Sequence, residues 1–143
     1  MLQRYSNKEL SYYPHMSADE SIIWGRFLAS KGQQYVRFDY DLRVGTGIEP
    51  VHDIPDKFKN DYIDLTRKRI DAVGYNGSVA TIFEVKNRAT FNVFGQIIGY
   101  RSLFLKSFPQ YSIKELVVVC ASIPLEDLEI VSSQGIVVLQ YPD

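Results

Sequence analysis

The feature that most constrains this chain is a pair of β-type runs joined by Asn76-Gly77. Residues 69–75 and 78–86 are rich in β-branched and aromatic residues, and Asn-Gly between two such runs is a strong signal for a type I′ hairpin. We therefore predict two antiparallel strands in the middle of the chain, and the rest of the fold must be built around them.

Helix and strand patterns flank the hairpin on both sides. Ser17 followed by Glu20 has the spacing of a capping box, and Gly32 ends the helix that this box begins. Alternation of polar and apolar residues predicts a strand over 35–44. After the hairpin, the patterns predict a helix over 90–106, an apolar strand over 116–120, a short helix over 124–131 and a last strand over 136–140.

This order of elements predicts an α/β fold with one central mixed sheet, flanked by helices on both faces. The two apolar strands near the C-terminus are separated by a helix, which favours a parallel crossover. A length of 143 residues predicts a single domain over residues 1–143. The Tyr-rich residues 1–16 are expected to form an N-terminal arm over the body. Residues 45–66 are expected to form an inserted loop, in which 55–63 are compatible with a short helix.

Composition argues against a membrane-spanning protein and against a secreted, disulfide-linked one. The chain has a single Cys, no run of 18 apolar residues and no apolar N-terminal segment, so we expect an intracellular, reducing, cytoplasmic setting and no membrane partner. Cys120 ends an apolar strand and is expected to be a core residue. His15 and His52 lack the spacing of a metal pair and are left out of the expected site.

The formal net charge of −1 hides an uneven distribution. Residues 67–106 carry seven basic and two acidic groups, a net charge of +5, whereas residues 107–143 carry one and five, a net charge of −4. Residues 45–66 carry two basic and five acidic groups, a net charge of −3. The central basic block suits a surface that faces a polyanion, although charge blocks are often only solvated faces.

The second run of the hairpin places charged groups on a strand that is otherwise apolar. With a period of two, Glu84 and Lys86 share a face, roughly 7 Å apart at about 3.3 Å per residue. Asp71 lies on the paired strand. Two carboxylates and a lysine suit Mg²⁺ or Mn²⁺, which prefer oxygen ligands and bridge to phosphates. The residues alone leave a second interpretation equally open, a cross-strand salt-bridge set at a solvated end of the hairpin.

Residues on the two long helices have double interpretations as well. Glu20 completes the capping box, yet it also heads an apolar stripe that must pack on the sheet. In the later helix, Gln96 and Tyr100 lie along one margin of the expected stripe, where they either reach a site at the edge of the sheet or are ordinary polar residues at the boundary of the core. Arg101 lies near the centre of the stripe. Arg101 then needs an anionic partner or reaches to solvent along its aliphatic stem. The expected stripe consists of Phe91, Phe94, Ile97, Ile98, Phe104 and Leu105.

These residues together resemble the PD-(D/E)xK nuclease superfamily. The specific part is IDAVG at 70–74, FEVK at 83–86 and GQIIGY at 95–100, and the order of elements agrees over residues 17–121. The stretch is similar to that of archaeal Holliday-junction resolvases, very-short-patch-type repair and restriction-type enzymes, and NucS-like nucleases. The resemblance implies a restriction-endonuclease-like core. One departure from the motif of the superfamily is that Ile70, and not a proline, precedes Asp71.

The resemblance also implies roles for individual residues. Asp71, Glu84 and the backbone carbonyl of Val85 would hold the divalent metal, and Glu20 matches a first-helix glutamate that some members use as an outer ligand. Lys86 would be the catalytic lysine, and Gln96 would orient the site or contact a phosphate. The expected contacts to nucleic acid are Arg67, Lys68, Arg69, Arg88, Tyr100, Arg101 and Lys106.

The sequence thus predicts a Mg²⁺- or Mn²⁺-dependent DNA endonuclease, with branched DNA in recombination or repair as one expected substrate. A chain this short has little room for a separate recognition domain, so we expect a homodimer or a partner protein that targets it. One alternative is a non-catalytic module that keeps the nuclease fold to bind nucleic acid or protein. Another is a structural subunit that docks through the acidic C-terminal block.

Overall fold

A single six-stranded sheet, in the order β1-β2-β3-β4-β5-β6, runs through the computed structural model, which describes residues 5–7, 10 and 12–142. Its strands are β1 (Tyr5–Ser6), β2 (Arg37–Val44), β3 (Lys68–Asn76), β4 (Val79–Arg88), β5 (Ser112–Ser122) and β6 (Val137–Gln140). Strands β1 to β4 pair in antiparallel fashion, whereas β4, β5 and β6 are parallel. The predicted α/β class, the mixed sheet of five longer strands and the parallel crossover are confirmed.

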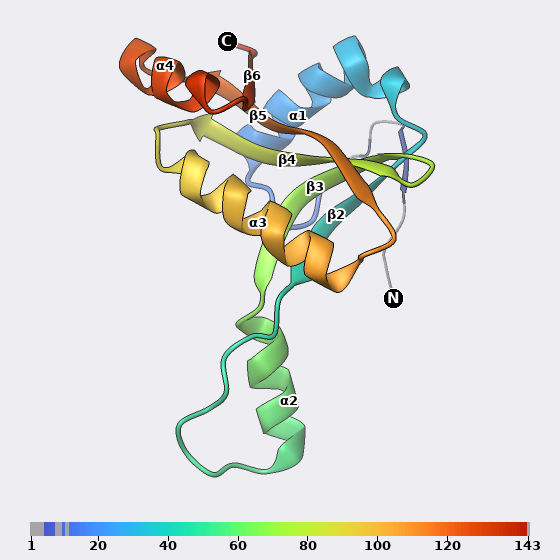
Figure 1. Ribbon diagram of the computed structural model, residues 1–143, viewed down its shortest axis with the longest axis vertical. Helices are drawn as coiled ribbons and strands as arrows, with labels where there is room; N and C mark the ends of the chain where they lie inside the picture. Colours follow the sequence, from blue (N-terminus) through green and yellow to red (C-terminus); the bar gives the residue numbers. More distant parts are fainter. Residues whose placement is uncertain (1–4, 8–9, 11, 143) are drawn as a thin grey trace.

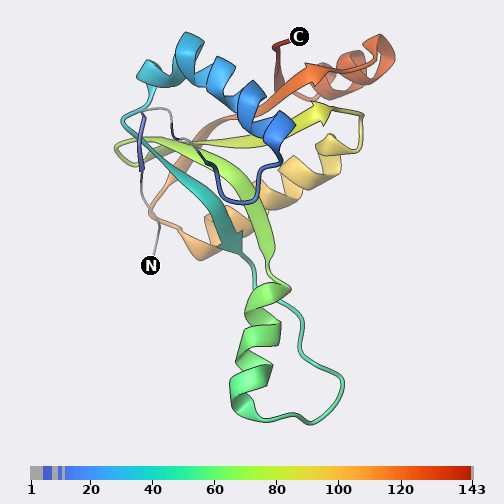
Figure 2. The ribbon, with the colours of Figure 1, turned by 180° about the vertical axis from the view of Figure 1, so that it is seen from behind.

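Four helices accompany the sheet: α1 (Ala18–Lys31), α2 (Asp56–Leu65), α3 (Val93–Ser107) and α4 (Leu125–Ser133). Helix α1 covers one face, and α3 and α4 cover the other (Figures 1 and 2). Helix α2 lies apart from both layers, at the end of a protrusion below the sheet in Figure 1. Within the described ranges, no helix is both long enough and apolar enough to cross a membrane.

Helix α1 begins at the predicted capping box. The Ser17 hydroxyl accepts the Glu20 N–H at 3.1 Å, and the Glu20 carboxylate accepts the Ser17 N–H at 2.9 Å. The helix buries Trp24 and Phe27 against Phe83 on the sheet, with ring centroids 5.1 and 5.0 Å from that of Phe83. This aromatic packing fixes α1, and therefore Glu20 at its first turn, relative to β4.

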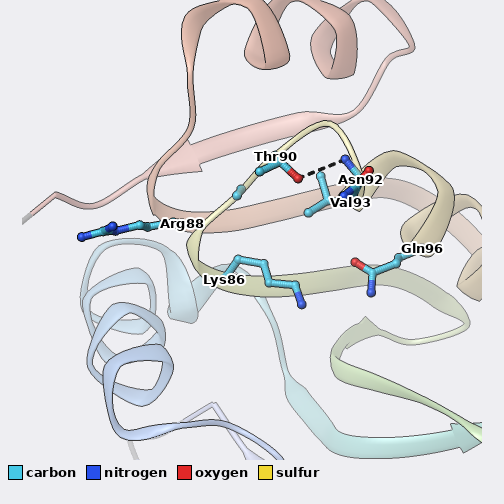
Figure 3. A pocket seen from close by; sticks show the side chains of 7 residues that line it. Lys86, Arg88, Thr90, Asn92, Val93 and Gln96 are labelled. Carbon is cyan, nitrogen blue, oxygen red and sulfur yellow. Dashed lines mark hydrogen bonds between the residues drawn. The ribbon is translucent and has the colours of Figure 1, made fainter.

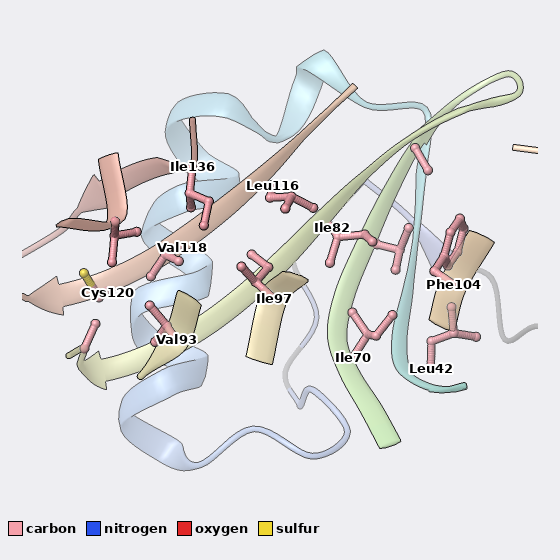
Figure 4. Close-up of a cluster of buried hydrophobic side chains, with 14 of the residues drawn as sticks. Leu42, Ile70, Ile82, Val93, Ile97, Phe104, Leu116, Val118, Cys120 and Ile136 are labelled. Atoms are coloured by element: carbon pink, nitrogen blue, oxygen red, sulfur yellow. The ribbon is translucent and has the colours of Figure 1, made fainter. Parts of the chain in front are cut away.

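The opposite core lies between the sheet and helices α3 and α4 (Figure 4). Helix α3 begins at Val93 and buries Val93, Ile97 and Phe104. Two expectations for this helix are wrong, because the helix begins after Phe91 and because its buried face is centred on Val93, Ile97 and Phe104. Phe91 precedes the helix and is 53% exposed, and Arg101 is exposed and not at the centre of the buried stripe.

The hairpin between β3 and β4 is present, but its turn lies one residue later than predicted. Asn76 pairs with Val79, so the two-residue loop is Gly77-Ser78. Of these two residues only Gly77 has a positive φ, 59°. A type I′ turn needs positive φ at both central residues, whereas type II′ needs it at the first, where glycine is preferred. The pattern is therefore that of type II′.

The N-terminal arm is partly built into the body. Strand β1 pairs with β2, and Tyr13 is buried with its ring edge-on to Tyr40 at 5.0 Å, although Tyr12 is exposed. The rest of this expectation, at residues 1–4, 8–9 and 11, lies outside the described residues. The expected loop over 45–66 contains α2, which agrees with the short helix expected over 55–63.

Candidate functional site

The candidate site lies where strands β3 and β4 part. Their last cross-strand pair is Ala72–Phe83. In the same register the next two residues, Asp71 and Glu84, are opposite each other, but the ladder ends before them. Beyond this fork β3 follows β2 toward the protrusion, whereas β4 continues beside β5 (Figure 1). Opposed residues of an antiparallel pair project to the same face, so both carboxylates belong to the opening of the fork.

Hydrogen bonds and charges hold the site residues together. The Val85 N–H donates to Asp71 Oδ2 at 2.8 Å, which replaces a ladder hydrogen bond across the fork. Lys86 Nζ lies 3.5 Å from Glu84 Oε1. Glu84 is buried and Lys86 is half-exposed, so the pair reaches from the interior to the surface. The structure thus brings together Asp71, Glu84, Val85 and Lys86 as the sequence predicts.

The two carboxyl groups do not have ordinary acidities. Burial raises the pKa of Glu84 above its usual range, and the nearby charge of Asp71 raises it further, while Lys86 opposes the shift. Burial also raises the pKa of Asp71, whereas the Val85 N–H lowers it and the charge of Glu20 raises it. Buried acids whose pKa values stay raised although a cation lies beside them are typical of functional sites.

The donor set fits a small divalent cation held by few protein ligands. Glu84 Oε2 is buried and makes no hydrogen bond within the described part of the chain. A cation bound by Asp71 and Glu84 would relieve their mutual repulsion and satisfy that oxygen. Searched over the described residues, no group of three or more His, Cys, Asp or Glu side chains is arranged for a metal ion. Mg²⁺ commonly uses one or two carboxylates and completes its shell with water and substrate phosphates.

Glu20 acts on the site electrostatically. Its carboxylate is bonded to the Ser17 N–H in the capping box, so the helix-cap role proposed from the sequence is present. Its charge nevertheless contributes to the raised pKa of Asp71, which places the first turn of α1 beside the fork. The cap and an electrostatic role therefore coexist in one side chain.

Helix α3 contributes two of the expected residues. Tyr100 is half-buried, and besides burial the charges of Glu84 and Asp71 raise the pKa of its hydroxyl. The phenol therefore stays protonated next to the carboxylates and can donate a hydrogen bond. Gln96, one turn earlier, is exposed. The sequence predicts both residues along one margin of the buried stripe, and the structure places Tyr100 at the half-buried part of α3 and Gln96 on its exposed part.

A polar pocket of about 540 Å³ opens beside the fork (Figure 3). Its lining comes from the end of β4 and the beginning of α3: Lys86, Arg88, Ala89, Thr90, Asn92, Val93 and Gln96. Two of these residues are cationic and none is acidic, so the pocket favours an anion. Lys86 belongs to both the pocket and the carboxylate pair, which makes the two parts one continuous site.

A neighbouring cluster was missed by the sequence analysis. Asp41 is ion-paired with Arg69 at 3.0 Å, and His15 Nδ1 lies 4.0 Å from Asp41 Oδ1. His15 and Asp41 both have positive φ, 67° and 51°. Such conformations in non-glycine residues are uncommon and often mark functional regions. The charge of His15 also acts on Asp71, which places this cluster beside the fork. Spacing along the chain contains no signal for this contact.

The expected nucleic-acid contacts divide into two groups. Arg67 and Arg69 are half-buried, and each is paired with an aspartate of the chain itself, Asp64 and Asp41. Their charges are used in ion pairs within the fold, around the beginning of β3. The side chains that remain exposed are Lys68, Arg88, Arg101 and Lys106.

Comparison of the chain with protein-family models, with curated proteins and with solved structures finds no match.

Proposed function

We propose that this protein is a metal-dependent DNA endonuclease of the PD-(D/E)xK type. The observation that carries the proposal is the opposition of Asp71 and Glu84 at the fork, with Lys86 two residues after Glu84 on the same strand. A simple salt-bridge set would balance its charges, whereas here two buried carboxylates share one partly exposed lysine. Two buried carboxyl groups that resist ionisation beside a single lysine support a cation site, because a bound cation would let both of them ionise.

Asp71, Glu84 and the carbonyl of Val85 would hold Mg²⁺ or Mn²⁺. When bound, such an ion supplies positive charge against the phosphate and lowers the pKa of water. Lys86 donates a hydrogen bond to a phosphate oxygen and stabilises the negative charge that grows as a water oxygen bonds to phosphorus and the bond to the leaving oxygen breaks. Tyr100 donates a hydrogen bond to the phosphate from the α3 side. The attacking water releases its proton to solvent, and the leaving oxygen takes up a proton from solvent.

The pocket beside the fork supports a phosphodiester substrate. Lys86 and Arg88 provide two cations in a space without acidic lining, which suits a backbone phosphate next to the one that is cleaved. Arg101 and Lys106 on α3 are further exposed cations outside the pocket. Contacts to phosphates alone do not read sequence, so we propose that selectivity comes from the shape of the DNA, with branched DNA as the first candidate.

The test is an incubation of the full-length protein with branched, duplex and single-stranded DNA, with and without Mg²⁺ or Mn²⁺. We expect cleavage of at least one DNA with metal and none with chelator, and loss of cleavage in Asp71→Asn. Asp19→Asn, which removes an exposed carboxylate from the first turn of α1, is the matched control. Absence of cleavage of all three DNAs, with binding retained, would favour the non-catalytic module instead.

A further inference from the structure

The pocket beside the fork combines an apolar floor with hydrogen-bonding side chains. Ala89 and Val93 line it although they are only 1% and 2% exposed, so they form the floor. The exposed lining residues with hydroxyl or carboxamide groups are Thr90, Asn92 and Gln96. A flat apolar ring with a polar edge fits such a lining, whereas a bare phosphate gains nothing from an apolar floor.

The two carboxamides of the pocket lie where they can contact one ligand. Asn92 and Gln96 are four residues apart at the beginning of α3, so they lie on the same side of its first turn. The Asn92 side chain makes no cap hydrogen bond, and Gln96 is exposed. A carboxamide both donates and accepts hydrogen bonds, and so do the edges of nucleobases.

The backbone that carries these side chains is fixed by hydrogen bonds. The Asn92 N–H donates to the Thr90 hydroxyl at 3.3 Å, and the Val93 N–H donates to the Thr90 carbonyl at 3.1 Å (Figure 3). The Phe91 N–H donates to the carboxylate of Asp127 on α4 at 2.9 Å. These bonds tie the segment between β4 and α3 to α4, so the pocket is formed before a ligand arrives.

The two cations of the pocket can contact different phosphates of one strand. Lys86 and Arg88 are two residues apart on β4, a separation of about 7 Å at 3.3 Å per residue. Figure 3 shows the Lys86 ammonium directed toward the Gln96 carboxamide, whereas Arg88 is directed away from both. Since Lys86 also lies 3.5 Å from Glu84, a phosphate on Lys86 is next to the fork.

We propose that the pocket binds one unpaired nucleotide of a DNA strand, the one next to the bond that is cleaved. Its phosphate contacts Lys86, its base lies on the apolar floor, and the edge of the base bonds to the two carboxamides. The volume of about 540 Å³ agrees with an occupant larger than a phosphate, because sites for whole small molecules measure about 300–1,000 Å³. This inference rests on the proposed nuclease function.

Only an unpaired nucleotide can fill the pocket in this way. A paired base keeps its faces and its edge inside the duplex, and the cost of extruding it is smallest where the base is already unpaired. Bases at branch points and bulges are of this kind. The pocket therefore names the feature of branched DNA that the protein selects, an unpaired nucleotide beside the cleaved bond.

The first experiment titrates the full-length protein with dAMP or with deoxyribose 5-phosphate, followed by NMR in chelator so that no cleavage occurs. We expect dAMP to bind at least about tenfold more tightly, with shifts of the amide signals of residues 89–96, because only dAMP carries a base. Asn92→Ala and Gln96→Ala should each weaken dAMP about fivefold and leave deoxyribose 5-phosphate unchanged. Gln110→Ala, which removes an exposed carboxamide beyond the other end of α3, is the matched control.

The second experiment compares cleavage with Mg²⁺ of a duplex that has one unpaired adenosine, the same duplex with an abasic nucleotide there, and the fully paired duplex. We expect cleavage beside the unpaired adenosine to be about tenfold faster than cleavage of the other two. Equal cleavage of all three, with dAMP bound, would assign the pocket to free nucleotides and overturn the proposal.

The two experiments separate this proposal from the proposed function. A protein that cleaves DNA but binds dAMP no better than deoxyribose 5-phosphate would overturn the nucleotide pocket and leave the nuclease. A dAMP affinity that is unchanged in both Asn92→Ala and Gln96→Ala would do the same. Absence of cleavage of every DNA would overturn the proposed function and, with it, the assignment of the pocket to a DNA strand.

Discussion

The Val85 amide donates to Asp71 Oδ2 at 2.8 Å across the point where β3 and β4 separate. This bond places a carboxylate where a backbone carbonyl would otherwise continue the ladder, and it holds Asp71 opposite Glu84. The separation of β3 from β4 therefore produces both the fork and the candidate site. Strand β3 follows β2 toward the protrusion, strand β4 stays with β5, and the polar groups exposed by their separation are satisfied by the site residues.

Stability without metal should decrease as the pH rises from about 4 toward the alkaline range. The pKa of Glu84 is raised in the folded state, so between its unfolded and folded pKa values the folded chain binds more protons, and ionisation then favours unfolding. Glu84→Gln removes this cost and should increase the free energy of unfolding at pH 9 by several kcal/mol, because the folded-state pKa of about 8 lies well above the usual value of 4.5 and each pKa unit is worth about 1.4 kcal/mol. Urea unfolding at pH 4.5 and pH 9 measures the difference.

Glu129→Gln, on the exposed surface of α4, is the control for that experiment and should show no such pH dependence. Added Mg²⁺ should stabilise the wild-type chain at pH 9 far more than Glu84→Gln, because the metal binds ionised carboxylates. A Glu84→Gln chain that is less stable than the wild type at pH 9 would show that the Glu84 carboxylate is well paired as it stands.

Tyr100→Phe should lower the cleavage rate about tenfold while the chain stays folded. The hydroxyl is a protonated donor beside the carboxylates, and removal of a single donor to a developing charge costs at least this much in many enzymes. The measurement is single-turnover cleavage at saturating protein, together with thermal unfolding. Tyr12→Phe, at an exposed tyrosine, should be indistinguishable from the wild type. Equal rates for the two variants would remove Tyr100 from the site.

Glu20→Gln should separate the two roles of Glu20. Glutamine also completes a capping box, so this variant should keep its thermal stability, whereas Glu20→Ala should lose about 1 kcal/mol. Loss of the Glu20 charge lowers the pKa of Asp71, because that charge raises it. The acidic limb of the cleavage rate profile should therefore move to lower pH in Glu20→Gln. An unchanged profile would leave Glu20 as a helix cap alone.

Substitutions of Asp41 test whether the backbone beside the site is strained. Its φ of 51° is costly for a residue with a side chain, and glycine adopts it freely. Asp41→Ala and Asp41→Gly both lose the ion pair with Arg69, so their difference isolates the backbone. We expect Asp41→Gly to be more stable than Asp41→Ala by about 1 kcal/mol in urea unfolding. Equal stability, or a more stable alanine variant, would mean that the conformation has no cost here.

Local patterns predicted most of the fold. The capping box at Ser17, the alternation in β2 and the order of the later elements all act over a few residues, so they can be read without tertiary contacts. The turn lies one residue later than predicted because the register of the two strands pairs Asn76 with Val79. Arg101 was misplaced because the buried face of α3 is centred on Val93, Ile97 and Phe104, which turns Arg101 away from the core.

Local patterns also predicted part of the candidate site. Asp71, Glu84 and Lys86 could be found because they interrupt apolar strands at fixed spacing. The contact of His15 and Arg69 with Asp41 joins three distant segments, and only the folded chain reveals it. The roles of Arg67 and Arg69 in internal ion pairs were likewise invisible, because a charge count cannot tell an exposed cation from a paired one.

Lys86→Ala is the most direct test of the proposal that the fork is a metal-dependent centre for cleaving phosphodiester bonds. Single-turnover DNA cleavage with Mg²⁺ should fall at least about a hundredfold in this variant, with DNA binding retained. Lys114→Ala, which removes an exposed lysine from the neighbouring strand β5, should cleave at the wild-type rate. Equal cleavage by Lys86→Ala and Lys114→Ala would show that Lys86 has no part in cleavage and that the fork is not the catalytic centre.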